Sequence, residues 1–168
     1  MDERSRILIV EPNRGYLTML GRRLSEAGFR VTCSDCATSA LAELYRTPVD
    51  LVLAELNMPG IGGPEMTRAI RSQVQWRDLP VMLITGRSEP KGAVRAYEAG
   101  ADDVVLKPFH FEVLFARMER RLARARSVQA LIGDNAVLDA RVVERAIQIG
   151  ELREQLAAIG PEAARASR

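Results

Sequence analysis

The chain has 168 residues, of which 47% are hydrophobic and 27% are charged, and its formal net charge is +2. This composition excludes a wholly disordered chain, and the length allows one globular domain with a modest appendage. The small net charge does not indicate a nucleic-acid partner, and without a signal peptide or an apolar run of roughly 18–20 residues we expect a cytoplasmic protein with no membrane association.

Short apolar runs in the first two thirds of the chain predict β-strands. Runs that are apolar at every position are typical of parallel strands that are covered on both faces. The four clear runs and one weaker run, in chain order, are Ile7–Val10, Phe29–Cys33 (the weaker one), Leu51–Ala54, Val81–Ile84 and Val104–Leu106.

The segments between these runs have helical periodicity. Leu17, Leu20 and Leu24 stand three and four residues apart before Gly28, which is placed as the residue that ends a helix. Further helices are predicted after residue 36, after Gly63, before Gly100 and from about 111 to 126. The alternation of strand and helix predicts an α/β domain with a doubly wound, five-stranded parallel sheet and five helices.

Ligands in such folds bind beyond the carboxyl ends of the strands, near the point where the strand order reverses. The residues at these ends are Glu11, Pro12, Glu55, Thr85 and Lys107. They are therefore the first candidates for a functional site.

Four segments, taken in order, resemble the receiver domain of two-component response regulators. They are ILIVE at 7–11, DLVLAELNMPG at 50–60, VMLITG at 81–86 and EAGADDVVLKPF at 98–109. The resemblance runs from Arg6 to Arg124 and implies a flavodoxin-like sheet with strand order 2-1-3-4-5. We expect a receiver domain over residues 1–127.

The resemblance also implies roles for the residues at the strand ends. In this family an acidic pair after the first strand, with the segment after the third strand, holds Mg²⁺, and an aspartate there accepts a phosphoryl group. By position, the metal pocket falls on Glu11, Pro12 and Asn57, the acceptor on Glu55, and the phosphate contacts on Thr85 and Lys107.

Two of these positions depart from the family pattern. Pro12 supplies no carboxylate, and Glu55 extends its carboxylate by one methylene group beyond that of an aspartate. Phosphoryl transfer depends on positioning and charge neutralisation, so we expect weak or absent Mg²⁺ binding, no phosphoryl acceptor and a degenerate pocket. We also expect an ion pair between Glu55 and Lys107.

Two interpretations of Glu55 remain open at this stage. Its longer charged side chain can imitate the phosphorylated state, or the pocket can be no more than a packed polar end of the sheet. The family's switch also uses an aromatic residue three positions before the lysine, and this chain has Val104 there. A valine cannot swing a ring between buried and exposed sites, which favours a fixed state, although valine is also an ordinary strand residue.

Charged residues near the fifth strand and helix suggest a dimer face like that of receivers in transcription factors. The acidic members are Glu98, Asp102 and Asp103, and the basic members are Arg117, Arg120 and Arg121. A symmetric homodimer would let each acidic set meet the arginines of the other subunit. The alternative is a solvated charged face.

The remaining residues predict a C-terminal amphipathic helical extension over 128–158. A turn is predicted at Ile132–Asn135, and apolar residues then follow at spacings of three or four: Leu138, Val142, Ala146, Ile149, Leu152 and Leu156. Their stripe would cover the receiver, a second copy or a partner protein. Gly160-Pro161 predicts the end of the helix, and residues 159–168 are expected to be a disordered tail.

These features predict a phosphorylation-independent pseudo-receiver that acts through protein–protein interaction or dimerisation in bacterial two-component signal transduction. The alternative is a single-domain response regulator that is still phosphorylated or switched by a ligand at the altered pocket. No nucleophile–base pair is apparent, Cys33 and Cys36 lack a second cysteine pair, and His110 is the only histidine. We therefore expect no enzyme and no cofactor, and a histidine kinase, an output protein or another response regulator as partner.

Overall fold

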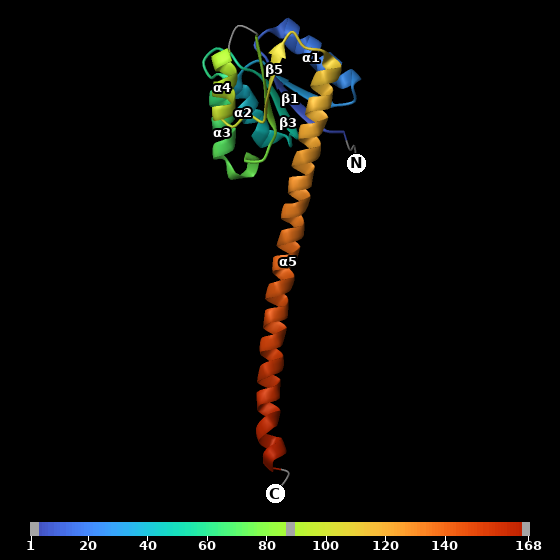
Figure 1. Ribbon diagram of the computed structural model, residues 1–168, viewed down its shortest axis with the longest axis vertical. Coiled ribbons are helices and arrows are strands. Elements are labelled where there is room, and N and C mark those ends of the chain that lie inside the picture. The colour runs from blue at the N-terminus through green and yellow to red at the C-terminus, as the bar shows by residue number, and fades with distance from the viewer. Residues whose placement is uncertain (1–3, 87–89, 166–168) are drawn as a thin grey trace. The chain divides into compact units, whose positions relative to one another are not determined.

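The computed structural model describes residues 4–86 and 90–165, and side chains over 4–86 and 91–155 (Figure 1). The strands are β1 (Arg6–Val10), β2 (Arg30–Ser34), β3 (Leu51–Glu55), β4 (Val81–Gly86) and β5 (Asp103–Lys107). The helices are α1 (Arg14–Glu26), α2 (Ala37–Arg46), α3 (Gly63–Ser72), the short 3₁₀ helix η1 (Val74–Trp76), α4 (Pro90–Glu98) and α5 (Phe111–Arg165). The chain divides into two units after Ala125.

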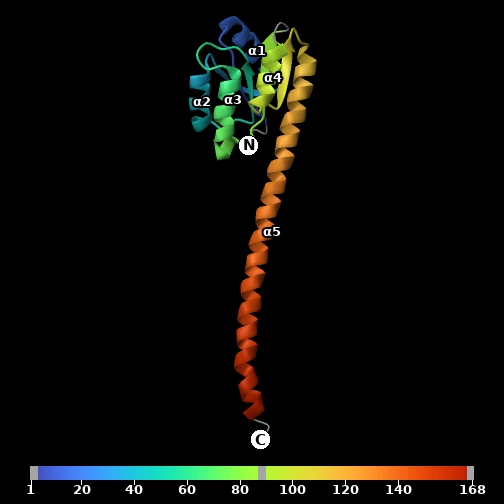
Figure 2. The same ribbon diagram turned by 60° about the vertical axis from the view of Figure 1, so that its left-hand side comes forward.

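The first unit is built on a parallel sheet with strand order β2-β1-β3-β4-β5, which confirms the predicted fold class. The sheet is covered on both faces, by α2, α3 and α4 on one side and by α1 and the beginning of α5 on the other (Figures 1 and 2). All four apolar residues from Ile7 to Val10 are completely buried. The continuous apolar runs in the sequence reflect this double covering.

Side chains and glycines define the limits of the first helices. The Asn13 side chain accepts a hydrogen bond from the Tyr16 amide at 2.9 Å and thereby caps α1. Gly28 has a φ of +93°, so the residue predicted to end this helix does adopt the left-handed conformation that favours glycine. The Asn13 cap places the first turn of α1 beside the end of β1, where candidate site residues lie.

Helix α5 differs from the sequence prediction. It is one continuous helix, so the predicted turn at Ile132–Asn135 is wrong, and the expected tail is helical from 159 to 165. Residues 166–168 lie outside the described residues. A single exposed glycine lowers helix stability by only about 1 kcal/mol relative to alanine, which does not interrupt a cooperative helix at Gly133. Pro161 also lacks a backbone amide, and the helix nevertheless continues to Arg165.

The second unit consists of the part of α5 that follows Ala125. Side chains from 129 to 155 are all exposed. In the part of the chain that the structure describes, no helix is both long and apolar enough to span a bilayer.

Candidate functional site

The carboxyl ends of β1, β3 and β5 bring three of the predicted site residues together. Glu11 follows β1 directly, Glu55 is the last residue of β3, and Lys107 is the last residue of β5. Because the three strands are parallel and lie in one sheet, their ends share one edge, and side chains more than forty residues apart converge there.

Lys107 is the centre of this cluster. Its Nζ donates to Glu55 Oε2 at 2.6 Å and to Glu11 Oε2 at 3.3 Å. The side chains of Lys107, Glu55 and Glu11 are 30%, 12% and 6% exposed, so the ammonium bridges two largely buried carboxylates. The expected Glu55–Lys107 ion pair is confirmed, and Glu11 adds a second acidic partner to it.

The second oxygen of each carboxylate is held by the backbone. Glu11 Oε1 accepts from the Asn13 amide at 2.9 Å, and Glu55 Oε1 accepts from the Asn57 amide at 3.3 Å. Each carboxylate therefore accepts one hydrogen bond from the loop that follows its own strand and another from Lys107. This arrangement fixes both side chains at the end of the sheet.

Tyr16 completes the cluster, and the sequence analysis did not include it. Lys107 Nζ lies 4.1 Å from the centre of the Tyr16 ring, which is a cation–π contact. The sequence held only part of the signal: an Asn13 cap places Tyr16 in the first turn of a helix that begins at the same sheet edge, but it does not specify where the ring lies.

The electrostatics of the cluster favour a charged lysine. Burial opposes the charged form of Lys107, but the hydrogen bond that it donates to Glu55 and the charges of Glu55 and Glu11 outweigh this effect, so the pKa of Lys107 is raised. Burial also raises the pKa of Tyr16, and the lysine charge only partly offsets this. With both pKa values raised, Lys107 is an ammonium and Tyr16 a neutral phenol at neutral pH.

Thr85 and Val104 lie on the neighbouring strands β4 and β5. Thr85 is completely buried, and its Oγ1 has no hydrogen-bond partner among the described residues. Val104 is 7% exposed and belongs to the apolar cluster that includes Ala96 and Ala101. Two residues later, Leu106 is 49% exposed.

The model of the response regulator receiver domain matches residues 7–119. The chain belongs to the response regulator receiver family. The match begins within β1 and ends within α5.

Individual relatives agree with this assignment. The receiver is 32% identical over 142 residues to the sensory transduction protein RegX3 of Mycolicibacterium smegmatis, with 84% of this chain and 61% of the relative covered. It is 36% identical over 120 residues to the transcriptional regulatory protein TctD of Salmonella typhimurium, with 71% of this chain and 53% of the relative covered. The chain thus spans little more than half the length of these two relatives.

A solved structure supports the fold. The receiver domain of a signal transduction histidine kinase from Syntrophus aciditrophicus aligns with a TM-score of 0.67 and 33% sequence identity, and the alignment covers 71% of this chain and 90% of that one. The receiver fold is therefore shared with proteins that differ in their other parts.

The residues of the predicted dimer face are partly engaged within the chain. Asp103 is buried and pairs with Arg117, whose Nε lies 2.9 Å from Asp103 Oδ2, and with Arg121 at 3.7 Å. Asp102 Oδ2 accepts from Arg71 at 2.7 Å. Glu98 and Arg120 are exposed. The geometry ties both aspartates to their own subunit, and the dimer face stays a prediction.

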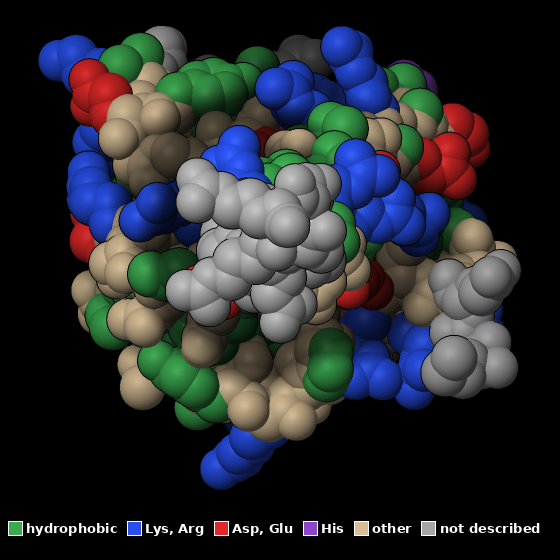
Figure 3. Space-filling view, turned by 90° about the horizontal axis from the view of Figure 1, so that it is seen from below, with side chains coloured by type: hydrophobic (Ala, Val, Ile, Leu, Met, Phe, Trp, Pro, Cys, Tyr) green, Lys and Arg blue, Asp and Glu red, His purple; other side chains and the backbone are tan. Residues whose placement is uncertain are grey.

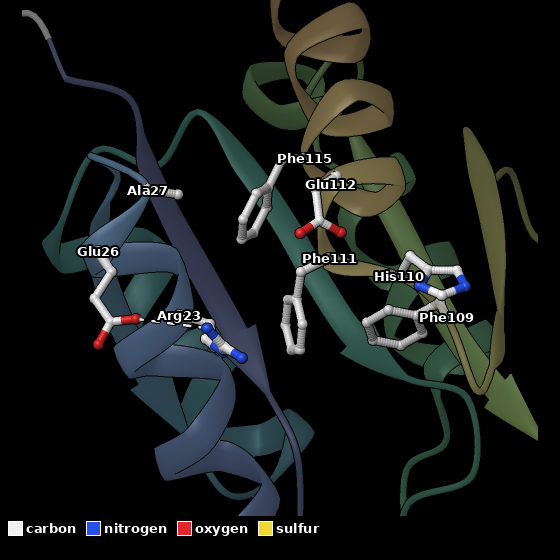
Figure 4. Close-up of a pocket in the computed structure, with 8 residues that line it drawn as sticks. All are labelled: Arg23, Glu26, Ala27, Phe109, His110, Phe111, Glu112 and Phe115. Atoms are coloured by element: carbon white, nitrogen blue, oxygen red, sulfur yellow. Dashed lines mark ion pairs between the residues drawn. The ribbon is translucent and has the colours of Figure 1, made fainter.

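A hollow of about 430 Å³ lies between the end of α1 and the beginning of α5 (Figure 4). Phe109, Phe111 and Phe115 form its aromatic side, with ring centres 5.6 Å and 5.8 Å apart along the series. Arg23 approaches the Phe111 ring from α1 with its guanidinium carbon 5.2 Å from the ring centre. An aromatic wall with a charged rim is typical of a surface that contacts another protein.

Basic side chains are distributed over the face shown in Figure 3. Figure 3 shows Lys and Arg side chains (blue) together with hydrophobic (green) and acidic (red) side chains.

Proposed function

We propose that this receiver signals independently of phosphorylation, as a protein–protein interaction module in two-component signal transduction. The contact that carries the proposal is the 2.6 Å ion pair between Glu55 and Lys107. Glu55 stands at the family's acceptor position, and in this pair its carboxylate binds the lysine that would otherwise contact the phosphate. An incoming phosphodonor would have to displace this pair before it could reach Glu55.

The donor set does not fit Mg²⁺. Position 12 is a proline, and both carboxylates of the cluster already accept from the Lys107 ammonium. Among the described residues there is no group of three or more acidic, histidine or cysteine side chains that could hold a metal ion. Since Mg²⁺ demands a near-octahedral set of oxygen ligands, its affinity for this pocket should be low.

The position of the aromatic switch supports the same proposal. Val104 is packed into the apolar cluster of its own domain. A small aliphatic side chain in a packed core has no alternative exposed site to swing into, so occupancy of the pocket would not be reported through this residue.

Intact-mass measurement after incubation with Mg²⁺ and a small phosphodonor tests the proposal. Wild type should gain no phosphate, whereas the double variant Pro12→Asp, Glu55→Asp should gain one, because it restores both altered positions. The double variant is the matched control for donor activity. A stable phosphate on Glu55 of the wild type would overturn the proposal.

One observation favours a second candidate, a single-domain regulator that is switched by a ligand. Thr85 Oγ1 is buried without a partner among the described residues, and an unpaired buried hydroxyl is costly unless something completes it. An oxygen of a bound anion could do so. Isothermal titration with inorganic phosphate distinguishes the candidates: saturable binding that Thr85→Val abolishes would favour the switch.

The partner class follows from the family and from the exposed apolar surface. Receiver-type partners are histidine kinases, output proteins or other response regulators, and two surfaces offer contacts to them. One is the aromatic hollow between α1 and α5. The other includes the exposed side chains of Tyr97 in α4, Leu106 in β5 and Val113 in α5.

A further inference from the structure

The part of α5 after Ala125 carries apolar side chains that nothing described in the chain covers. Leu131, Leu138, Val142, Ile149 and Leu152 are between 51% and 66% exposed. Apolar groups of this size are buried in most folded proteins, and long exposed helices are rarely stable without packing. This part of the helix therefore needs a partner that covers its apolar side chains.

These residues follow a seven-residue repeat. With Val128 as the first a position, the a positions are Val128, Asn135, Val142 and Ile149, and the d positions are Leu131, Leu138, Arg145 and Leu152. The repeat is maintained through the segment that the sequence analysis took for a turn. A strict heptad repeat on a continuous helix produces one seam that stays aligned with a neighbouring helix.

The residue types at the seam indicate which partner fits it. From Val128 to Leu152, the apolar a positions are β-branched and the apolar d positions are leucine. In parallel coiled coils this combination favours two strands, and one asparagine at an a position sets the register, because it meets its own copy at the same level. We infer that this segment pairs with a second copy of this chain in a parallel, two-stranded coiled coil.

The remaining residues are compatible with this pairing. Gly133 and Gly150 fall at f and b positions, where they face away from the seam, and an added Cβ at either would meet no atom within 4 Å. Arg145 occupies one d position, and its long stem can remain at the seam while its guanidinium reaches water.

This inference deepens the proposed function, on which it rests for its signalling role, by naming one partner. Dimerisation is measured without phosphodonor or Mg²⁺. A chain that does not dimerise would therefore contradict this inference alone, and phosphate on Glu55 would contradict the proposed function alone. The control is the set of exposed apolar residues away from the seam, which includes Val143 at b and Ile147 at f, 59% and 57% exposed.

Sedimentation velocity on two double variants tests the seam. The seam variant combines Val142→Asp with Ile149→Asp, and the control variant combines Val143→Asp with Ile147→Asp. Both make the same chemical change to the same residue types on the same helix. Like charges facing one another across a seam are strongly unfavourable, so the first should weaken dimerisation by at least about 100-fold and the second by less than about 3-fold. A monomeric wild type at about 100 µM, or equal effects of the two variants, would overturn the inference.

Disulfide formation tests the direction of the helices. In a Cys33→Ser, Cys36→Ser background, Val142→Cys should form an intermolecular disulfide on oxidation, because equivalent a positions face each other in a parallel pair. Val143→Cys in the same background should not. An uncrosslinked Val142→Cys dimer would exclude the parallel arrangement. Unfolding of the receiver is monitored separately by fluorescence of Trp76, which lies in η1 outside this helix.

Discussion

Lys107 holds two carboxylates that would otherwise repel each other at the end of the sheet. Replacing it with methionine keeps most of the side-chain volume but leaves Glu11 and Glu55 facing each other without a cation. We expect Lys107→Met to lower the free energy of unfolding by about 1–3 kcal/mol, as measured by urea denaturation. Lys91, the only other lysine, is exposed on α4, so Lys91→Met should change stability by less than about 0.5 kcal/mol.

The raised pKa of Lys107 gives this contribution a definite pH dependence. A lysine whose pKa is higher in the folded state stabilises the fold fully below the pKa of the unfolded chain, and this stabilisation is lost as the pH rises through the folded value. The stability difference between wild type and Lys107→Met should thus be constant near neutral pH and narrow above the ordinary lysine value of 10.5. A difference unchanged at high pH would mean that packing, not charge, holds the cluster.

The sequence allowed the Glu55–Lys107 pair to be predicted because both residues end parallel strands of one sheet. It did not indicate that Glu11 shares the same ammonium or that the Tyr16 ring lies against it. Those contacts depend on side-chain rotamers and on the angle at which α1 leaves β1. Pattern and spacing do not specify either quantity.

At the scale of elements, the junction between β3 and α3 leaves no room for a side chain at Gly63. A Cβ on Gly63 would lie 2.8 Å from the Glu55 carbonyl oxygen and 3.0 Å from Leu56 Cα, both backbone atoms. Helix propensity alone would favour alanine here, but the backbone clash should dominate. We expect Gly63→Ala to destabilise the receiver by about 1–3 kcal/mol in urea denaturation.

Gly133→Ala is the matched control for this substitution. Gly133 also lies in a helix, but an added Cβ meets no atom within 4 Å, so propensity should decide the outcome. Helicity measured by circular dichroism should rise, with a gain of up to about 1 kcal/mol in helix stability. If both alanines were destabilising, close backbone approach would not be the reason for glycine at position 63.

The elements themselves were largely predictable, with one informative exception. The five strands and their parallel arrangement follow from apolar runs and from strand–helix alternation, whereas the strand order was implied only by the resemblance to the receiver family. The continuity of α5 could not be predicted in this way, because the glycine, aspartate and asparagine at 133–135 are typical of turns. On a long helix their weak local preferences are outweighed by cooperativity and by the heptad repeat in which Asn135 takes an a position.

At the scale of the whole molecule, the two units have different sources of stability. The receiver has two clusters of buried apolar residues, and the last residue of either cluster along the chain is Leu122. The described side chains after Ala125 contribute no residue to either cluster, and we infer that this segment depends on association with a second chain. The receiver should consequently fold on its own core, and its stability should not depend on protein concentration.

Truncation after Ala125 tests this separation. The shortened receiver should unfold in urea with a free energy within about 0.5 kcal/mol of the full chain, as followed by the fluorescence of Trp76, the only tryptophan. The full chain should show a second transition, seen by circular dichroism at 222 nm, whose midpoint rises with protein concentration because mass action couples the second unit to dimerisation. A truncated receiver that fails to fold, or a helix signal that is independent of concentration, would show that the two units do not derive their stability separately.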